Sequence, residues 1–111
     1  MQLDLARLAI YHQATEVEDP ELLILTSLAD GPKHGYAIMS DVRSMTGIRL
    51  GPGTLYGAIP RLEQAGLIEA VESNDRRRPY RLTGRGAETL RARLGSMRDL
   101  SAAGLRRLEA T

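Results

Sequence analysis

The first part of the chain carries apolar residues at helical spacing. Leu5, Leu8 and Tyr11 recur every three residues, and this spacing predicts a short amphipathic helix over residues 3–14. The acidic stretch TEVEDP follows it. We therefore predict an N-terminal helix and an acidic linker over residues 1–18.

A second helical pattern opens with a clear start signal. The side chain of Asp19 is suited to capping a helix, and Pro20 suits the first helical position. The charge of Glu21 favours the positive end of the helix dipole. Gly31 followed by Pro32 is a common stop signal. The inner stripe of this helix is predicted to be Leu22, Leu25 and Leu28.

A third helix is predicted between Gly35 and Gly47. The sequence IRL, which comes directly after it, is predicted to form a minimal strand. The apolar residues of the helix recur every three positions, and they are Tyr36, Met39, Val42 and Met45.

The stretch GPGTLYGAIPRLEQAGL predicts a further helix. Gly and Pro open it, and Gly66 is placed to end it, with Leu67 packing back on the last turn. Pro60 lies well inside and removes one backbone hydrogen bond. We expect a local kink, a loosened first turn, or a helix that begins later. The apolar stripe is Leu55, Ala58, Ile59 and Leu62.

The hydrophobic period changes after this helix. The stretches LIEAVES and PYRLT are short, contain Val, Ile and Tyr, and flank a polar segment, which is a hairpin pattern. Thr83 can then cap a final helix. Gly95 and Gly104 weaken that helix by about 1 kcal/mol each relative to alanine, so it needs a partner to bury its apolar stripe. That stripe is Leu90, Leu94, Met97, Leu105 and Leu108.

The order of these elements is that of a winged helix-turn-helix. The predicted fold class is mainly α with a small β-hairpin wing, flanked by an N-terminal helix and a long C-terminal dimerisation helix. We place the winged helix-turn-helix at residues 19–83 and the dimerisation helix at residues 84–111. In this arrangement the third core helix enters the DNA major groove, and the wing lies over the backbone or minor groove.

The predicted recognition helix carries side chains suited to reading DNA. Steps of 100° per residue place Gly57, Arg61 and Gln64 opposite the apolar stripe, with Thr54 and Tyr56 on the flanks. Arg and Gln suit bidentate contacts to guanine and adenine edges. A glycine lets a phosphate or groove wall approach the backbone closely. An ordinary amphipathic helix with a polar outer face explains the same pattern.

Two further groups are candidate phosphate contacts. Arg76, Arg77 and Arg78 lie at the hairpin tip, where their planar, always charged forks suit phosphate. A soluble turn is the alternative reading. The start of the second core helix faces the DNA backbone in this fold, and its donors are Lys33, His34 and Tyr36. Tyr36 fits the core equally well, because it begins the apolar stripe.

Charge is divided unevenly along the chain. Residues 1–75 carry five basic and eleven acidic side chains, whereas residues 76–111 carry ten basic and three acidic ones, within a net charge of +1. This split indicates a polyanionic partner or pairing between unlike surfaces. A solvated, arginine-rich helix accounts for it equally well.

Composition excludes several classes of site. The chain has no cysteine, so disulfides and thiolate metal sites are excluded, and no apolar run is long enough to cross a membrane. The N-terminus lacks a secretion-signal pattern, and we expect a cytoplasmic protein. The two histidines, His12 and His34, lie far apart, so we predict no metal site. We find no catalytic constellation, and GPGTLYG lacks the Walker lysine, so we predict neither an enzyme nor a cofactor.

Three stretches together resemble the PadR family of bacterial transcription regulators. They are LLILTSLADGPKHGYAIM, GPGTLYGAIPRLEQAGLIE and DRRRPYRLTGRG, which cover roughly residues 20–90. The resemblance implies a homodimeric repressor with the C-terminal helix as its main dimer contact, joined by the N-terminal helix with Leu5 and Leu8. The short length is similar to the smaller subgroup with a single C-terminal helix. Its implied DNA contacts in this chain are His34, Tyr36, Thr54, Tyr56, Arg61 and Arg76 to Arg78.

The resemblance also bears on ligands and on the operator. Some family members release DNA when a phenolic acid or a planar cationic drug binds, and drug-binding relatives use a tryptophan at the dimer interface. This chain has no Trp and no Phe, but Met97 and the C-terminal leucines could line a pocket for a small apolar or aromatic effector. A homodimer implies a palindromic operator on double-stranded DNA, with half-sites about one helical turn apart.

A rival interpretation comes from a different class of function. The chain could be a winged-helix module for protein interaction or dimerisation that binds no specific DNA, and the acidic first 75 residues favour this slightly. The two interpretations differ in their response to salt. DNA binding falls steeply with salt, whereas a mainly apolar protein interface does not.

Overall fold

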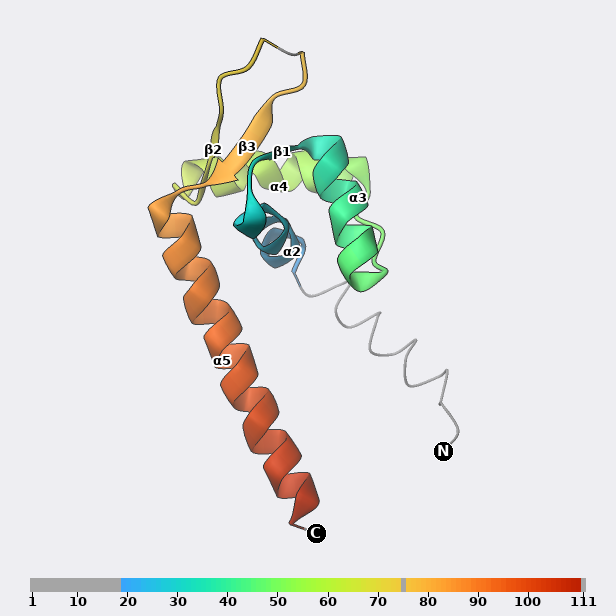
Figure 1. The fold of residues 1–111 in the computed structure, drawn as a ribbon, viewed down its shortest axis with the longest axis vertical. Coiled ribbons are helices and arrows are strands. Elements are labelled where there is room, and N and C mark those ends of the chain that lie inside the picture. Colours follow the sequence, from blue (N-terminus) through green and yellow to red (C-terminus); the bar gives the residue numbers. More distant parts are fainter. Residues whose placement is uncertain (1–18, 75, 111) are drawn as a thin grey trace.

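The computed structural model describes residues 19–74 and 76–110. Helices pack beside a small antiparallel sheet whose strand order is β1-β3-β2, and the wing projects beyond them (Figure 1). The chain is thus mainly α with a small wing, and the prediction of a winged helix-turn-helix is confirmed. The predicted helix over residues 3–14, with Leu5 and Leu8, lies outside the described residues. The elements are α2 (Pro20–Ser27), η1 (Leu28–Asp30), β1 (Lys33–His34), α3 (Gly35–Thr46), α4 (Pro52–Gln64), β2 (Ile68–Ala70), β3 (Pro79–Leu82) and α5 (Gly84–Glu109).

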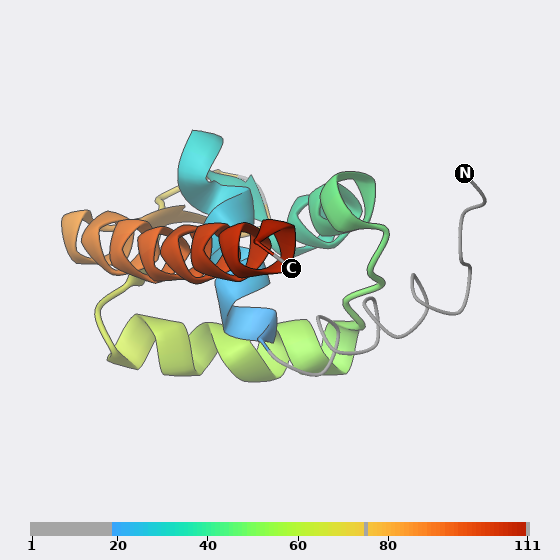
Figure 2. The ribbon, with the colours of Figure 1, turned by 90° about the horizontal axis from the view of Figure 1, so that it is seen from below.

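Helix α2 lies at the centre of the molecule. Its cap is the predicted one, because Asp19 Oδ1 accepts a hydrogen bond of 2.9 Å from the backbone N–H of Leu22. The helix packs against α3, α4 and α5 (Figure 2). Leu23, Ile24 and Leu25 are therefore all buried, and the apolar surface is wider than the predicted stripe.

Two of the three strands are those predicted from the sequence, since β2 lies within LIEAVES and β3 within PYRLT, but the third strand is not. Strand β1 pairs with β3, with Lys33 opposite Tyr80, and β2 pairs with β3 on its other side. The prediction of a strand over residues 48–50 is wrong, since this segment pairs with no strand in the described part of the chain. Ile48 and Leu50 are nevertheless buried. They anchor the connection between α3 and α4 to the core.

Helix α3 buries a different face from the predicted one. Gly35, Ile38 and Val42 are its buried residues, whereas Tyr36 is 70% exposed and Met45 is 46% exposed. A three-residue step advances a helix by only 300°, so four such positions drift about halfway around it. The observed spacing of three and then four residues stays on one face. Tyr36 therefore belongs to the surface.

Helix α4 confirms its predicted stripe. Leu55, Ala58, Ile59 and Leu62 are all buried. The helix begins at Pro52 and continues through Pro60 to Gln64, so its start is no later than predicted (Figure 2). Pro60 removes the amide that would bond the carbonyl of Tyr56, and both residues are exposed, so water can replace that bond. Gly66, at φ +75°, turns the chain toward β2.

Helix α5 begins at the predicted cap and extends away from the core. Thr83 Oγ1 accepts a hydrogen bond of 2.9 Å from the N–H of Gly86. The helix leaves the molecule on the side opposite the wing and is about 39 Å long, at 1.5 Å per residue (Figure 1). Leu90 was predicted to face a second copy, but it is 5% exposed and packs within the core of its own chain. It therefore has no surface to offer to a dimer. The other predicted stripe residues, Leu94, Met97, Leu105 and Leu108, are exposed.

Candidate nucleic-acid interface

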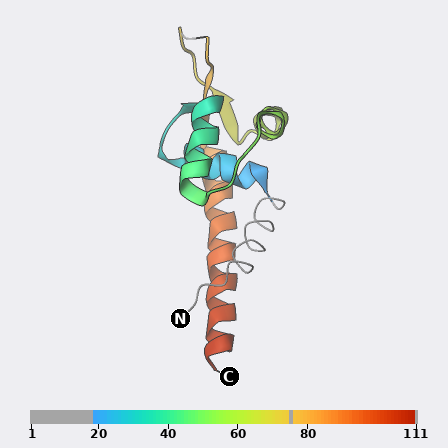
Figure 3. The same ribbon diagram turned by 90° about the vertical axis from the view of Figure 1, so that its right-hand side faces the viewer.

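Three elements meet around one cleft. The N-terminus of α3, one flank of α4 and the wing between β2 and β3 enclose about 420 Å³. Figure 3 looks along α4 and shows it beside the base of the wing. Among residues 19–74 and 76–110, no carboxylate lines this cleft, which favours an anionic partner. Its lining residues are His34, Gly35, Tyr36, Tyr56, Arg76, Arg77, Arg78 and Tyr80, and six of these were predicted to bind DNA.

The ring of Tyr56 rests on the backbone of α3. A Cβ atom at Gly35 would lie 2.4 Å from Tyr56 Oη and 2.8 Å from Tyr56 Cζ, so only glycine leaves room for the ring. His34 caps the same helix, and its Nδ1 accepts a hydrogen bond of 3.3 Å from the N–H of Ala37. The 53% exposed ring of Tyr56 is therefore held at the opening of the cleft.

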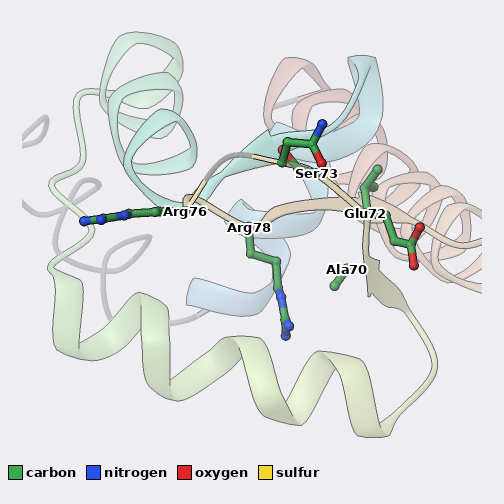
Figure 4. A pocket seen from close by; sticks show the side chains of 7 residues that line it. Ala70, Glu72, Ser73, Arg76 and Arg78 are labelled. Carbon is green, nitrogen blue, oxygen red and sulfur yellow. The ribbon is translucent and has the colours of Figure 1, made fainter.

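The wing directs its arginines to two sides. All three are exposed. Arg78 points from the wing toward α4, whereas Arg76 extends to the left in Figure 4, in a different direction from Arg78. A second cleft of about 760 Å³ lies along the wing, and Glu72 is the one carboxylate among its described lining residues. The wing thus presents fixed positive charge both toward α4 and toward the N-terminus of α3, as required of a phosphate contact.

The outer surface of α4 carries few long side chains. Thr54, Gly57 and Gln64 are exposed, as predicted. Arg61 lies on the flank that faces α2 rather than on the outer face, because its Nε donates a hydrogen bond of 2.9 Å to Glu21 Oε1. Its side chain is still 62% exposed. An exposed ion pair contributes only about 0–1 kcal/mol, so the contact with Glu21 is easily exchanged.

Lys33 was predicted to donate to phosphate, but the structure gives it a different role. Its ammonium group donates a hydrogen bond of 2.5 Å to the carbonyl of Ser27 and also contacts the carboxylate of Asp30. Asp41 lies 3.8 Å away. These contacts join α2, η1, β1 and α3. Only 18% of the side chain is exposed, so the charge of Lys33 is not free for a partner. The hydrogen bond from Lys33 lowers the pKa of Asp30.

Tyr80 forms the inner side of the first cleft. Sequence analysis did not select it, because a tyrosine in a strand next to a hairpin is typical of a core position. It packs against the core and also lines the cleft. Burial, together with the nearby carboxylate of Glu63, raises the pKa of its phenol. Tyr80 is therefore neutral at physiological pH and can donate a hydrogen bond.

Two other kinds of site were sought in the described part of the chain. Across residues 19–74 and 76–110, no three side chains of His, Asp or Glu are grouped closely enough to hold a metal ion. None of the helices there combines the length and the apolar character needed to span a lipid bilayer.

Known proteins share this sequence pattern and this fold. Over 83 residues the chain is 48% identical to an uncharacterized 37.1 kDa protein in transposon TN4556 of Streptomyces fradiae, and it matches 75% of its own length but only about a quarter (24%) of that relative. A PadR family transcription regulator from Clostridium difficile R20291 is 29% identical, with a TM-score of 0.70 over 78% of this chain and 95% of that one.

A padr family transcriptional regulator from Eggerthella lenta DSM 2243 is 27% identical. Its TM-score is 0.71, over 96% of this chain and 93% of that one. The family model described as "Transcriptional regulator PadR-like family" matches residues 24–92, which span α2 to the first turns of α5 and make up more than half of the chain. The chain therefore belongs to the PadR-like family of transcriptional regulators.

Proposed function

We propose that this chain is a sequence-specific, DNA-binding transcriptional regulator that acts in the cytoplasm. The observation that carries the proposal is the cleft where the wing arginines, the N-terminus of α3 and the flank of α4 meet, with no carboxylate among its described lining residues. In a winged helix these three elements are the ones that approach a duplex. Family membership supports the same function.

The residues divide into two roles. Arg76, Arg77 and Arg78 contact phosphates, and they set affinity and register but not sequence. His34 and Tyr36 add contacts at the start of α3. Helix α4 contacts the base edges. Its candidate residues are Thr54, Tyr56, Gly57 and Gln64, together with Arg61 once its ion pair with Glu21 is broken. Replacing Arg77 by alanine should weaken binding to all duplexes equally, whereas replacing Arg61 should reduce discrimination at particular bases.

The regulator acts as a homodimer through α5. Leu94, Met97 and Leu105 are 39%, 53% and 58% exposed and lie on one face of the helix. Leu100 is 75% exposed but lies about 100° from the centre of that face. Aspartate at Leu94 and Met97 should therefore give monomers by light scattering, whereas aspartate at Leu100 should leave the dimer intact. Monomeric wild-type protein at micromolar concentration would remove this part of the proposal.

A palindromic operator follows from that dimer, and repression is the mode of regulation that the resemblance to the PadR family implies. Two copies of α4 related by a twofold axis place two half-sites about one helical turn apart. A small apolar or aromatic effector would find its surface beside Met97 and the leucines of α5, which are exposed in the described chain. Effector binding at that helix would change the spacing of the two wings.

Fluorescence anisotropy tests the proposed function. The protein is titrated into duplex DNA from upstream of its own gene, with a scrambled duplex as the control, across a salt series. Tight binding to the upstream duplex alone, weakening with salt, is the expected result. Equal, weak and salt-independent signals on both duplexes would favour a protein-interaction module instead.

A further inference from the structure

A third cleft lies at the other end of the exposed face of α3. It encloses about 380 Å³ between α3, the connection over residues 47–51 and the first turn of α4. Arg43 and Arg49 contribute its positive charge, and Ser40 and Tyr36 contribute hydroxyl groups. Arg43 and Arg49 were not among the predicted DNA contacts, because isolated arginines form no sequence motif.

The charged residues that line this cleft are all positive. No carboxylate lines it. The one acidic residue of α3, Asp41, accepts a hydrogen bond of 2.7 Å from Ser27 on the opposite side of the helix. Among the ion pairs of the described residues, none includes Arg43 or Arg49. Both side chains are exposed, so both guanidinium groups can reach an anion.

The cleft adjoins the one beside the wing. Tyr36 lines both clefts, so the exposed face of α3 connects the wing arginines with Arg43 and Arg49. Such an extended, open surface suits a line of phosphates better than a single small anion, which needs an enclosed pocket. The first turn of α4 has no acidic residue, and its cap, Gly51, has no side chain to bond the N–H groups at the start of the helix. Those N–H groups therefore add to the attraction for phosphate.

We propose that Arg43 and Arg49 form a second phosphate contact for duplex DNA, at the N-terminal end of α4. The inference rests on the proposed DNA-binding function and extends it to residues outside the predicted interface. One DNA strand follows the exposed face of α3, held by the wing at one end and by Arg43 and Arg49 at the other. α4 is then fixed in its groove at two places along its length.

The salt dependence of binding tests this proposal. Each phosphate contact contributes about 0.9 to the slope of log affinity against log salt concentration. The double variant Arg43→Ala/Arg49→Ala should therefore lower the slope by about 1.8 for each bound protomer, or about 3.6 for the proposed dimer, and weaken binding to the upstream and scrambled duplexes by the same factor. The matched control is Arg106→Ala/Arg107→Ala, which removes the same charge from the far end of α5 and should leave the slope unchanged.

Further variants separate the possible outcomes. Lysine at positions 43 and 49 keeps the charge and should restore the wild-type slope. A wild-type slope in the alanine variant would overturn the proposal. So would saturable binding of inorganic phosphate at this cleft together with an unchanged duplex slope, because the cleft would then be a small-anion site. If wild-type protein binds no duplex at all, the proposed function itself fails, which is a distinct result.

Discussion

Replacing Gly35 by alanine should displace Tyr56 without unfolding the protein. The new Cβ atom would lie 2.4 Å from Tyr56 Oη, and ordinary contacts begin at 3.4 Å, so the ring must move by about 1 Å. It has room to do so, because Tyr56 is 53% exposed. Gly35 is the first residue of α3, where alanine is at least as favourable as glycine. Thermal stability should therefore not fall.

DNA affinity should fall through the loss of the Tyr56 contact. A hydrogen bond to a neutral base edge contributes about 0.5–1.5 kcal/mol, so Tyr56→Ala should weaken binding roughly 2- to 13-fold. Gly35→Ala should cost no more than this, and it should cost nothing further in the Tyr56→Ala background. Anisotropy on the four proteins of this double-mutant cycle measures both effects.

A matched control removes the effect of a methyl group at a helix start. Gly84 is the first residue of α5, and a Cβ atom there would meet nothing within 4 Å. Gly84→Ala should bind DNA as the wild type does. The reasoning is refuted if Gly35→Ala binds like the wild type, or if its effect persists unchanged without the Tyr56 ring.

Three further predictions concern the scaffold. Gly86→Ala places a Cβ atom 1.9 Å from the Leu67 carbonyl oxygen and should destabilise the fold by about 1–3 kcal/mol. Gly104→Ala meets nothing within 4 Å and should stabilise the fold by up to about 1 kcal/mol. Urea unfolding midpoints distinguish the two variants, and equal midpoints would count against the close approach of Gly86 to Leu67. Asp19→Asn keeps the helix cap but loses the ion pair that joins α2 to α5, so it should destabilise less than Asp19→Ala, which loses about 0.5–2 kcal/mol from the cap alone; thermal melts that rank them in the opposite order would contradict this. The raised pKa of Tyr80 means that the phenol loses its proton in the unfolded chain before it does so in the folded one. The stabilisation by the neutral phenol is therefore complete below the ordinary value of 10.0 and is lost as pH rises through the folded pKa. Absorbance at 295 nm should show a late-titrating phenol that Tyr80→Phe removes.

Local signals in the sequence were sufficient for most helix boundaries, although α2 ends at Ser27 and the 3-10 helix η1 occupies the rest of the span predicted up to Gly31. The caps Asp19 and Thr83 and the stop at Gly66 act through short-range hydrogen bonds or backbone preference, and each lies where the pattern placed it. The stripe of α4 was also readable, because a helix packed on one side keeps a regular spacing of buried residues. The wing was predicted because the spacing of hydrophobic residues changes from that of a helix to that of strands on both sides of a polar segment.

Features that depend on tertiary packing were not readable. Strand β1 has two residues, and it exists because β3 passes beside it. The arginines at positions 61 and 93 pair with acidic residues 40 and 74 positions away in the sequence, which no local pattern indicates. Lys33 illustrates the consequence for the candidate site, since a cation predicted for phosphate is held by its own chain.

Mapping of backbone amide chemical shifts on addition of a short duplex most directly tests the claim that α3, α4 and the wing form one DNA-binding surface. The account predicts that the largest shifts fall at residues 34–36, 53–57 and 76–78, with small changes at residues 97–108 of α5. Shifts concentrated on α5, with the wing and the N-terminus of α3 unaffected, would contradict it.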